Sequence, residues 1–248
     1  MLFANKELTE RGFITETLGL FSGDDGNFNN KDIILLPAPV TRNGVDINCP
    51  LTNKQIPLDI LNSAQENTKI FGGGKLGFKN YTDYLALDGY AIKNAVLTAE
   101  GAISYAIENT AFSLWKSRIL IIGYGRVGKV LAERIKGFKP RLTVTARNER
   151  DFATLQMLGI NHIGTSEIAN CKERFDIVFN TVDIKLSPDT ASALSSSLFL
   201  DLSTSGGFLY DDLEKFNIKY TKLPGIPGKT APDTAGRIIA ETVIKYSM

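Results

Sequence analysis

The feature that most constrains this chain is a glycine pattern that follows a short apolar run. Residues 119–122 are all isoleucine or leucine, and Gly123, Gly125 and Gly128 come directly after them with the spacing G-x-G-x-x-G. The apolar run predicts a buried strand, and the residues that follow predict a helix. Between a strand and a helix, this pattern is typical of a turn that holds a pyrophosphate, because free N–H groups at a helix N-terminus favour negative charge.

Each glycine has its own expected role in such a turn. Gly123 permits the tight turn, Gly125 lets the backbone approach the pyrophosphate, and Gly128 lets the helix and the strand pack closely. A glycine-rich turn without a ligand is the alternative. The predicted cofactor-binding loop consists of Gly123, Tyr124, Gly125, Arg126, Val127 and Gly128.

The residues after this loop alternate between short apolar runs and helical stretches. Crossovers between parallel strands favour a doubly wound parallel sheet of the Rossmann type. An amphipathic helix is expected over 232–246, and another over 98–114, with Thr98 as its N-cap. The predicted strands are 119–122, 142–145, 160–163, 176–179, 198–202 and 218–222.

The first part of the chain predicts a smaller α/β domain, of the flavodoxin-like kind, on the substrate side. Residues 33–36 and 69–71 indicate strands, and 57–65 indicate a helix. A helix over 2–11 stands first, so we interpret this domain as N-terminally shortened. The expected organisation is a substrate-side domain over 1–97, an inter-domain helix over 98–115 and a dinucleotide-binding domain over 116–248.

The net charge of the chain does not favour any class of highly charged partner. Lys and Arg number 28 against 27 Asp and Glu, which favours neither a nucleic acid nor an anionic membrane. No run approaches the roughly 18 apolar residues of a membrane helix, and no signal core opens the chain. Cys49 and Cys171 lack metal-type spacing; we interpret them as reduced thiols, with a single disulfide as the alternative. These features predict a cytoplasmic protein without a metal site.

The end of the second predicted strand indicates which dinucleotide binds. NAD enzymes usually place Asp or Glu there to hold the ribose 2′-hydroxyl, but this strand ends at Ala146 and Arg147. A guanidinium can bind a 2′-phosphate through two charge-assisted hydrogen bonds, with Asn148 and Arg150 close behind. Glu149 is the one residue that would favour NAD, if it reached the ribose. The pattern therefore favours NADP.

Polar residues follow the later strands, where ligands of such sheets bind. Asn180, Thr181 and Val182 come after the fourth strand, and Asp201 and Ser203 come at the end of the fifth. Both groups are expected to flank the nicotinamide ribose, although Asn180 and Thr181 could equally be ordinary strand-end residues. A carboxylate such as Asp201 at the end of a buried strand needs a partner or a purpose.

The loop after the sixth strand is rich in proline and glycine over 223–232. Its backbone, Ile226 included, is expected to approach the nicotinamide, and Lys229 to bind a substrate carboxylate. A rigid connector that caps the last helix is the alternative. The single histidine, His162, lies in the third predicted strand, away from the switch point, so the chemistry is not expected to use an imidazole base.

Several motifs occur together in an order that resembles a known family. Over about residues 30–248, the chain resembles the A subunit of dipicolinate synthase. The motifs are Thr98-Ala99-Glu100-Gly101, the glycine loop, Thr145-Ala146-Arg147, Asn180-Thr181, Leu200-Asp201-Leu202-Ser203, the residues 224–228, and Ala231-Pro232 followed by Thr234-Ala235-Gly236.

This resemblance implies an NADP-dependent oxidoreductase of spore-forming bacteria. It would oxidise dihydrodipicolinate, or its hydrated tetrahydro precursor, to dipicolinate in a branch of lysine biosynthesis. The implied partners are this small dicarboxylate substrate and a flavoprotein-like B subunit, and a homo-oligomer is left open. Loss of a hydride and a proton yields an aromatic ring, so a carboxylate could serve as the base.

The resemblance also suggests catalytic and substrate-binding residues. Glu100 is the predicted base, since it matches the family motif at the expected cleft between the domains; an acid that stabilises the helix dipole is the alternative. Lys75 falls where a second cation for a dicarboxylate would be useful, although a solvated loop lysine is the favoured interpretation. The loop 203–207 departs from the family, with Thr204-Ser205 where a bulkier or proline-containing turn is expected, which leaves the substrate open. The predicted substrate-binding residues are Lys75, Thr98, Ser205, Gly206 and Lys229.

Two other functions remain as alternatives. One is another NADP dehydrogenase, similar to methylenetetrahydrofolate dehydrogenase, which would need a Tyr and a Lys paired on a helix. Tyr81 and Tyr84 have no lysine at a compelling helical offset downstream. The other is a nucleotide-binding subunit without catalytic activity.

Overall fold

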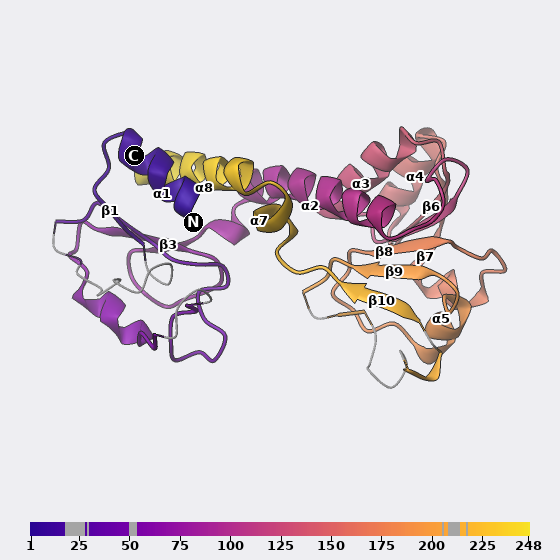
Figure 1. Cartoon of the computed structure of the whole chain (residues 1–248), viewed down its shortest axis with the longest axis horizontal. Coiled ribbons are helices and arrows are strands. Elements are labelled where there is room, and N and C mark those ends of the chain that lie inside the picture. The colour runs from indigo at the N-terminus through magenta and orange to yellow at the C-terminus, as the bar shows by residue number, and fades with distance from the viewer. Residues whose placement is uncertain (18–27, 29, 50–53, 205, 208–213, 217) are drawn as a thin grey trace. The chain divides into compact units, whose positions relative to one another are not determined.

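The computed structural model of the chain describes residues 1–17, 28, 30–49, 54–204, 206–207, 214–216 and 218–248 (Figure 1). The chain divides into two compact units, each built around a parallel sheet. The smaller unit comprises Met1–Asn94 and Ala231–Met248, and the larger comprises Ala95–Thr230. In the described ranges, no helix is both long and apolar enough to span a bilayer.

The larger unit contains a six-stranded parallel sheet in the order β10-β9-β8-β5-β6-β7. β5 pairs with both β6 and β8, so the strand order reverses beside β5, which is the switch point of a doubly wound sheet. The predicted Rossmann topology is therefore confirmed, with small differences at the strand ends. The strands are β5 (Arg118–Ile122), β6 (Arg141–Ala146), β7 (Asn161–Gly164), β8 (Ile177–Asn180), β9 (Leu198–Asp201) and β10 (Lys219–Lys222).

Helices cover both faces of this sheet, with α3 and α4 over one face and α5 over the other (Figure 1). Successive strand residues point to opposite faces. Ile119 accordingly packs with Leu131 of α3, whereas Leu120 packs with Ala191 of α5. The helices are α3 (Arg126–Lys136), α4 (Glu149–Met157), the 3-10 helix η3 (Thr165–Asn170), α5 (Pro188–Ala193), α7 (Ile226–Thr230) and the second part of α2 (Asp88–Glu108).

The smaller unit contains a four-stranded parallel sheet in the order β1-β2-β3-β4. Leu8 of α1 and Val243 of α8 pack with Ile33 on one face, and Leu61 of η1 packs with Ile34 on the other. The elements are α1 (Leu2–Glu10), β1 (Thr15–Thr17), β2 (Ile33–Leu35), the 3-10 helix η1 (Leu58–Ser63), β3 (Lys69–Gly72), β4 (Tyr81–Asp83), the 3-10 helix η2 (Tyr84–Ala86), the first part of α2, and α8 (Pro232–Ser247).

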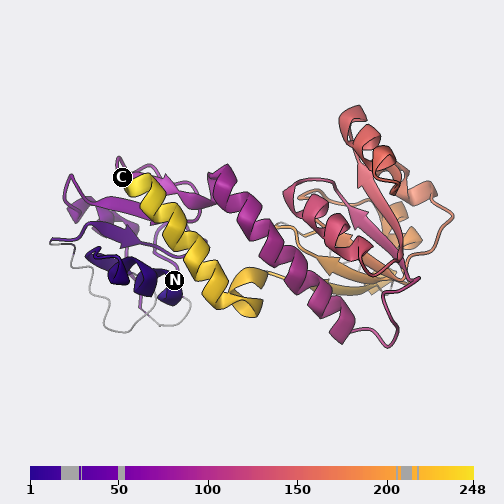
Figure 2. The same ribbon diagram turned by 90° about the horizontal axis from the view of Figure 1, so that it is seen from above.

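The C-terminal helix lies in a different unit from the one expected. α8 was predicted within a dinucleotide-binding domain over 116–248, but it packs beside α1 in the smaller unit (Figure 2). A Cβ on Gly236 would lie 2.3 Å from the Cβ of Phe3, so this glycine permits the close approach of the two helices. The apolar stripe of α8 could cover either sheet, and only the tertiary structure shows which one it covers.

The long helix also begins earlier than expected. α2 starts at Asp88, so Thr98 lies inside the helix and is not its N-cap. The helix ends at Glu108, and residues 109–114 are not helical. Good helix formers such as Ala91 and Ala95 extend it towards the N-terminus. The boundary between the two units falls within α2, so the predicted domain ends at 97 and 115 also differ from the structure.

Candidate dinucleotide-binding site

Two of the three loop glycines are required by packing within the turn. Gly123 leaves β5 with φ of 99°, a conformation that residues with a side chain rarely adopt. A Cβ at Gly123 would also lie 2.4 Å from a methyl group of Val182. A Cβ at Gly128, in the first turn of α3, would lie 2.1 Å from the carbonyl oxygen of Gly123. Strand, turn and helix can therefore approach this closely only with glycine at both positions.

Gly125 has a different environment. It is the N-cap of α3, with φ of −82°, and no side chain caps the helix there. Apart from the adjoining backbone, no atom lies within 4 Å of the position that its Cβ would take. The first turn of α3 carries no acidic residue, so the positive end of the helix dipole is not offset there by a carboxylate of the helix. Open space in front of a helix N-terminus is what a phosphate group requires.

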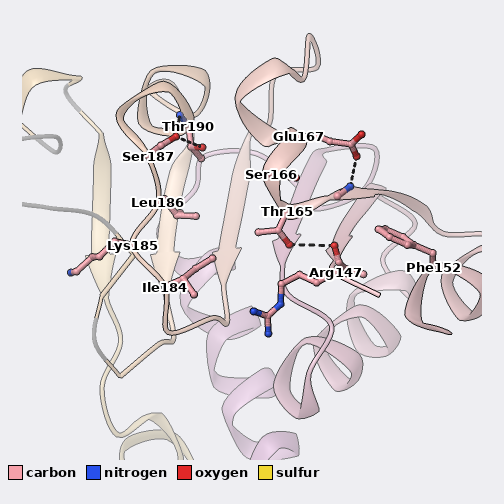
Figure 3. Close-up of a pocket in the computed structure, with 12 residues that line it drawn as sticks. Arg147, Phe152, Thr165, Ser166, Glu167, Ile184, Lys185, Leu186, Ser187 and Thr190 are labelled. Carbon is pink, nitrogen blue, oxygen red and sulfur yellow. Dashed lines mark hydrogen bonds between the residues drawn. The ribbon is translucent and has the colours of Figure 1, made fainter. Parts of the chain in front are cut away.

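A cavity of about 750 Å³ lies at the carboxyl ends of β6 and β7 (Figure 3). Arg147, which follows β6, extends its guanidinium into the opening towards Ile184, and Thr165 lies on the wall behind. The volume is within the usual range for a small-molecule site. The lining residues are Ala146, Arg147, Phe152, Thr190, and the segments 164–167 and 184–187.

Two acidic residues near this cavity, Asp151 and Glu167, already bind protein groups, and Glu149 is not part of its lining. β6 ends at the buried Ala146, so no carboxylate stands at the end of this strand. Asp151 lies 3.3 Å from the ammonium of Lys129. Glu167 accepts a hydrogen bond of 2.5 Å from the backbone N–H of Gly164 (Figure 3). Glu149 is exposed in the first turn of α4 and is not among the lining residues.

Asn148 has a structural role that was not predicted from the sequence. As the N-cap of α4, its Oδ1 accepts from the backbone N–H of Asp151 at 2.8 Å. Its Nδ2 donates to the carboxylate of Asp151, also at 2.8 Å. Asn148 therefore fixes the start of α4, and its exposed amide keeps a second N–H donor, so its predicted contact with the coenzyme stays a prediction. Arg150 is exposed on the same helix.

Asp201 is completely buried at the end of β9 and accepts five hydrogen bonds. Oδ1 accepts from the Nδ2 of Asn180 at 2.9 Å, from the N–H of Ser203 at 2.9 Å and from its hydroxyl at 2.6 Å. Oδ2 accepts from the N–H of Gly207 and the hydroxyl of Tyr220, both at 2.6 Å. Burial alone would raise the pKa of Asp201, but the hydrogen bonds from Ser203, Tyr220 and Asn180 hold it below its usual value.

These bonds make Asp201 an anchor for the loop that follows β9. The N–H of Gly206 donates to the hydroxyl of Ser203 at 3.1 Å, and the N–H of Leu186 donates to the carbonyl of Gly207 at 2.6 Å. The loops after β8 and β9 are thereby joined. Because its carboxylate is engaged by protein donors, Asp201 shapes this edge of the sheet rather than offering a free group to a ribose. Ser205, the predicted substrate contact in this loop, lies outside the described residues.

Comparison with known proteins agrees with this architecture. No protein-family model matches the chain. The A subunit of dipicolinate synthase from Bacillus subtilis (strain 168) is 28% identical over 236 residues, which cover 90% of this chain and 80% of that protein. The crystal structure of the same subunit from Bacillus halodurans matches 99% of this chain and 93% of its own, with a TM-score of 0.88 and 25% identity. The crystal structure from Bacillus subtilis matches 99% and 91%, with a TM-score of 0.85 and 27% identity.

The chain resembles the A subunit of dipicolinate synthase. The resemblance inferred from the motifs is thus confirmed, as is the α/β fold. The larger unit has the doubly wound Rossmann topology, a fold that commonly binds dinucleotides. The match covers nearly the whole chain, so it includes both units and not the glycine loop alone.

The structure places several motif residues in the interior of the larger unit. Tyr124 and Ile226 are nearly buried in the core on the α3 face. A Cβ on Gly101 would lie 2.2 Å from Cγ2 of Ile226, so α2 and α7 approach closely there. The hydroxyl of Thr181 donates to the carbonyl of Ile122 at 2.9 Å. These side chains shape the turns, and any contact of Ile226 with a ligand would involve its backbone.

The predicted catalytic and substrate-binding residues have more exposed surroundings. Glu100 lies on α2 with its carboxylate 3.9 Å from the guanidinium of Arg134, and its side chain is 55% exposed. Arg134 follows the start of α3 by about 12 Å along the helix axis, so Glu100 pairs with the part of α3 that is distant from the glycine loop. Lys229 is exposed on α7, and Lys75 is exposed in the smaller unit. Their roles stay predictions.

Three residues near the site, Tyr220, Thr145 and Thr165, were not predicted as functional from the sequence. Tyr220 reaches Asp201 because β10 pairs with β9 in a register that places Tyr220 opposite Phe199. Nothing in the local sequence indicates that register. Thr145 belongs to the motif that carried the resemblance, but its hydroxyl contacts became visible only with the strands assembled.

Proposed function

We propose that this chain is an NADP-dependent A subunit of dipicolinate synthase. It would act in the cytoplasm and oxidise dihydrodipicolinate, or its hydrated tetrahydro precursor, to dipicolinate, with a flavoprotein-like B subunit as partner. The observation that carries the coenzyme assignment is the open space in front of Gly125 at the start of α3. The similarity to the A subunits of dipicolinate synthase over almost the whole chain supports the choice of substrate.

The larger unit offers a suitable place for each part of the coenzyme. The N-terminus of α3 would hold the pyrophosphate, and the cavity beside β6 would hold the adenosine half. Arg147 lines this cavity where an NAD enzyme would carry a carboxylate, which supports NADP. The ends of β8 and β9 remain for the nicotinamide side, where the carboxylate of Asp201 binds the backbone N–H groups of Ser203 and Gly207.

The proposed reaction removes a hydride and a proton from the ring of dihydrodipicolinate; the hydrated tetrahydro precursor would first have to lose one water molecule. When bound, NADP⁺ supplies the hydride acceptor. The chain itself must position a dianionic substrate and provide a group that takes the proton. Lys229 is the proposed partner of a substrate carboxylate, and Glu100 is the proposed base. Product formation is favourable because the ring becomes aromatic, so a weak base suffices.

The direct test is coenzyme reduction by the purified chain. NADP⁺ or NAD⁺ is mixed with the freshly prepared lysine-pathway intermediate, with and without the B subunit, and formation of the reduced coenzyme is followed by absorbance. Reduction of NADP⁺ in preference to NAD⁺ would support the proposal. Dinucleotide binding without reduction in either mixture would favour the non-catalytic subunit. Reduction with methylenetetrahydrofolate alone would favour the folate dehydrogenase alternative.

Arg147→Ala should weaken the binding of NADP⁺ and leave that of NAD⁺ almost unchanged. The expected loss is roughly 1.5–3 kcal/mol, the usual contribution of a hydrogen bond to a charged group. Titration of the protein with each dinucleotide measures it. Arg141→Ala is a matched control, because Arg141 is an exposed arginine at the opposite end of the same strand. Equal losses for both dinucleotides would show that Arg147 does not bind the 2′-phosphate.

Lys229→Ala and Glu100→Gln should differ in their kinetics. Loss of the lysine should mainly raise the KM for substrate, whereas loss of the carboxylate should mainly lower kcat with the coenzyme affinity preserved. Arg134→Ala separates the two possible roles of Glu100, because it removes the ion pair and keeps the carboxylate. If Glu100→Gln and Arg134→Ala have the same small effect on kcat, Glu100 has only the structural role.

A further inference from the structure

Two threonine hydroxyls connect the glycine loop with the wall of the cavity. Thr145, at the end of β6, is completely buried. Its Oγ1 accepts a hydrogen bond of 3.0 Å from the backbone N–H of Gly123 and lies 3.0 Å from the Oγ1 of Thr165. Thr165 follows β7, lines the cavity and donates to the carbonyl of Ala146 at 3.4 Å (Figure 3). One series of bonds thus runs from the start of the loop to the cavity wall.

The direction of these bonds follows from the donors available. A backbone N–H can only donate and a carbonyl can only accept, while each hydroxyl has one proton to give. Gly123 therefore donates to Thr145, Thr145 donates to Thr165, and Thr165 donates to Ala146. Every group in the series then has a partner. If Thr165 instead donated to Thr145, the hydroxyl proton of Thr145 would lose Thr165 as its acceptor.

Packing alone does not explain why position 145 carries a threonine, because its buried hydroxyl is unfavourable without hydrogen bonds. Valine has nearly the same shape as threonine, and burying a hydroxyl is unfavourable unless it is hydrogen-bonded. Thr145 is the residue that meets the N–H of Gly123, the point at which the chain leaves β5 with positive φ. The orientation of this peptide sets the course of the turn towards Gly125.

We infer that Thr145 and Thr165 are positioning residues for the coenzyme. Their hydroxyl pair holds the first peptide of the glycine loop in the orientation that leaves the space before Gly125 open. Because Thr165 lies on the cavity wall, the same pair fixes the loop relative to the site of the adenosine half. This inference rests on the proposed coenzyme function and assigns the residues that hold its binding site in shape.

The first test replaces the hydroxyl and keeps the shape. Thr145→Val should weaken NADP⁺ binding by about tenfold, about 1.4 kcal/mol, because the N–H of Gly123 loses its acceptor. Thr145→Ser should restore the affinity to within about twofold, since serine retains the hydroxyl. Thr143→Val is the matched control: Thr143 is buried on the same strand but lines a different cavity, so the affinity should not change.

The second test asks whether the two hydroxyls act in series. Thr165→Val should weaken binding less than Thr145→Val does, and the double variant should bind no more weakly than Thr145→Val alone. If the fold-losses of affinity in the two single variants multiply in the double variant, the two hydroxyls act independently, and the inference that they act as a pair is wrong. Melting temperatures are measured in parallel, and a loss of stability with unchanged affinity would also overturn the inference. If Thr145→Val does not fold, Thr165→Val against wild type decides the outcome, because unchanged affinity there contradicts a role for the pair.

The failure of this inference is distinguishable from that of the proposed function. If wild type binds neither NADP⁺ nor NAD⁺, the proposed function is wrong. If wild type binds NADP⁺ and Thr145→Val binds it equally well, the function stands and the positioning role is wrong.

Discussion

Gly125→Val is expected to abolish dinucleotide binding while the free energy of unfolding changes by less than about 1 kcal/mol. The φ of −82° at this N-cap is accessible to valine, and apart from the adjoining backbone no protein atom lies within 4 Å of the position of its Cβ. The side chain would instead occupy the space in front of α3 that we assign to the pyrophosphate. An affinity loss of at least about 100-fold, roughly 2.7 kcal/mol, is expected.

Gly128→Ala provides the opposite case in the same loop. Its Cβ would lie 2.1 Å from a backbone oxygen, that of Gly123, which cannot move without distortion of the turn. We expect this variant to lower the free energy of unfolding by about 1–3 kcal/mol, as overpacked sites do. Denaturant unfolding and dinucleotide titration on both variants make the comparison. Unchanged nucleotide affinity in Gly125→Val would disprove the placement of the pyrophosphate.

Asp201→Asn is expected to be strongly destabilising although it preserves the shape of the side chain. The amide replaces one acceptor oxygen by an NH₂ group, which would then face either the donors from Ser203 and Asn180 or those from Gly207 and Tyr220. A buried donor without an acceptor costs about 1–3 kcal/mol. Because the new NH₂ group would face several donors, we expect the free energy of unfolding to fall by about 3 kcal/mol. Asp189→Asn, at an exposed position of α5, should change stability by less than about 0.5 kcal/mol.

The contribution of Asp201 should also depend on pH in a defined direction. Its pKa is lowered in the folded protein, so the carboxylate stabilises the fold fully above the unfolded pKa of about 3.9. This contribution is lost as the pH falls through the folded value. Urea unfolding of wild type and Asp201→Asn from neutral to acidic pH should therefore show a difference that shrinks below about pH 4. A difference that is absent at neutral pH would contradict the role of Asp201 as the anchor of this loop.

The local patterns of the sequence determined the larger sheet and the glycine turn that follows β5. A buried strand is recognisable in the sequence as an apolar run, and a turn with close backbone contacts is recognisable by its glycines. Both patterns are independent of the rest of the chain. The six strands and the glycine loop were therefore predictable. β1 and β4 were not, because strands as short and polar as Thr15–Thr17 and Tyr81–Asp83 leave no apolar run.

Only the tertiary structure decided which distant groups meet. The apolar stripe of α8 indicates that the helix is half-buried, but not that it packs on the smaller sheet. The carboxylate of Asp201 required a partner, yet Tyr220 became one only through the register of β10 on β9. The same is true of Thr145 in β6 and Gly123, which directly follows the neighbouring strand β5. Apolar burial is non-directional and shows in composition and period, whereas a hydrogen bond between separate strands depends on register and ångström-scale distances that no local pattern encodes.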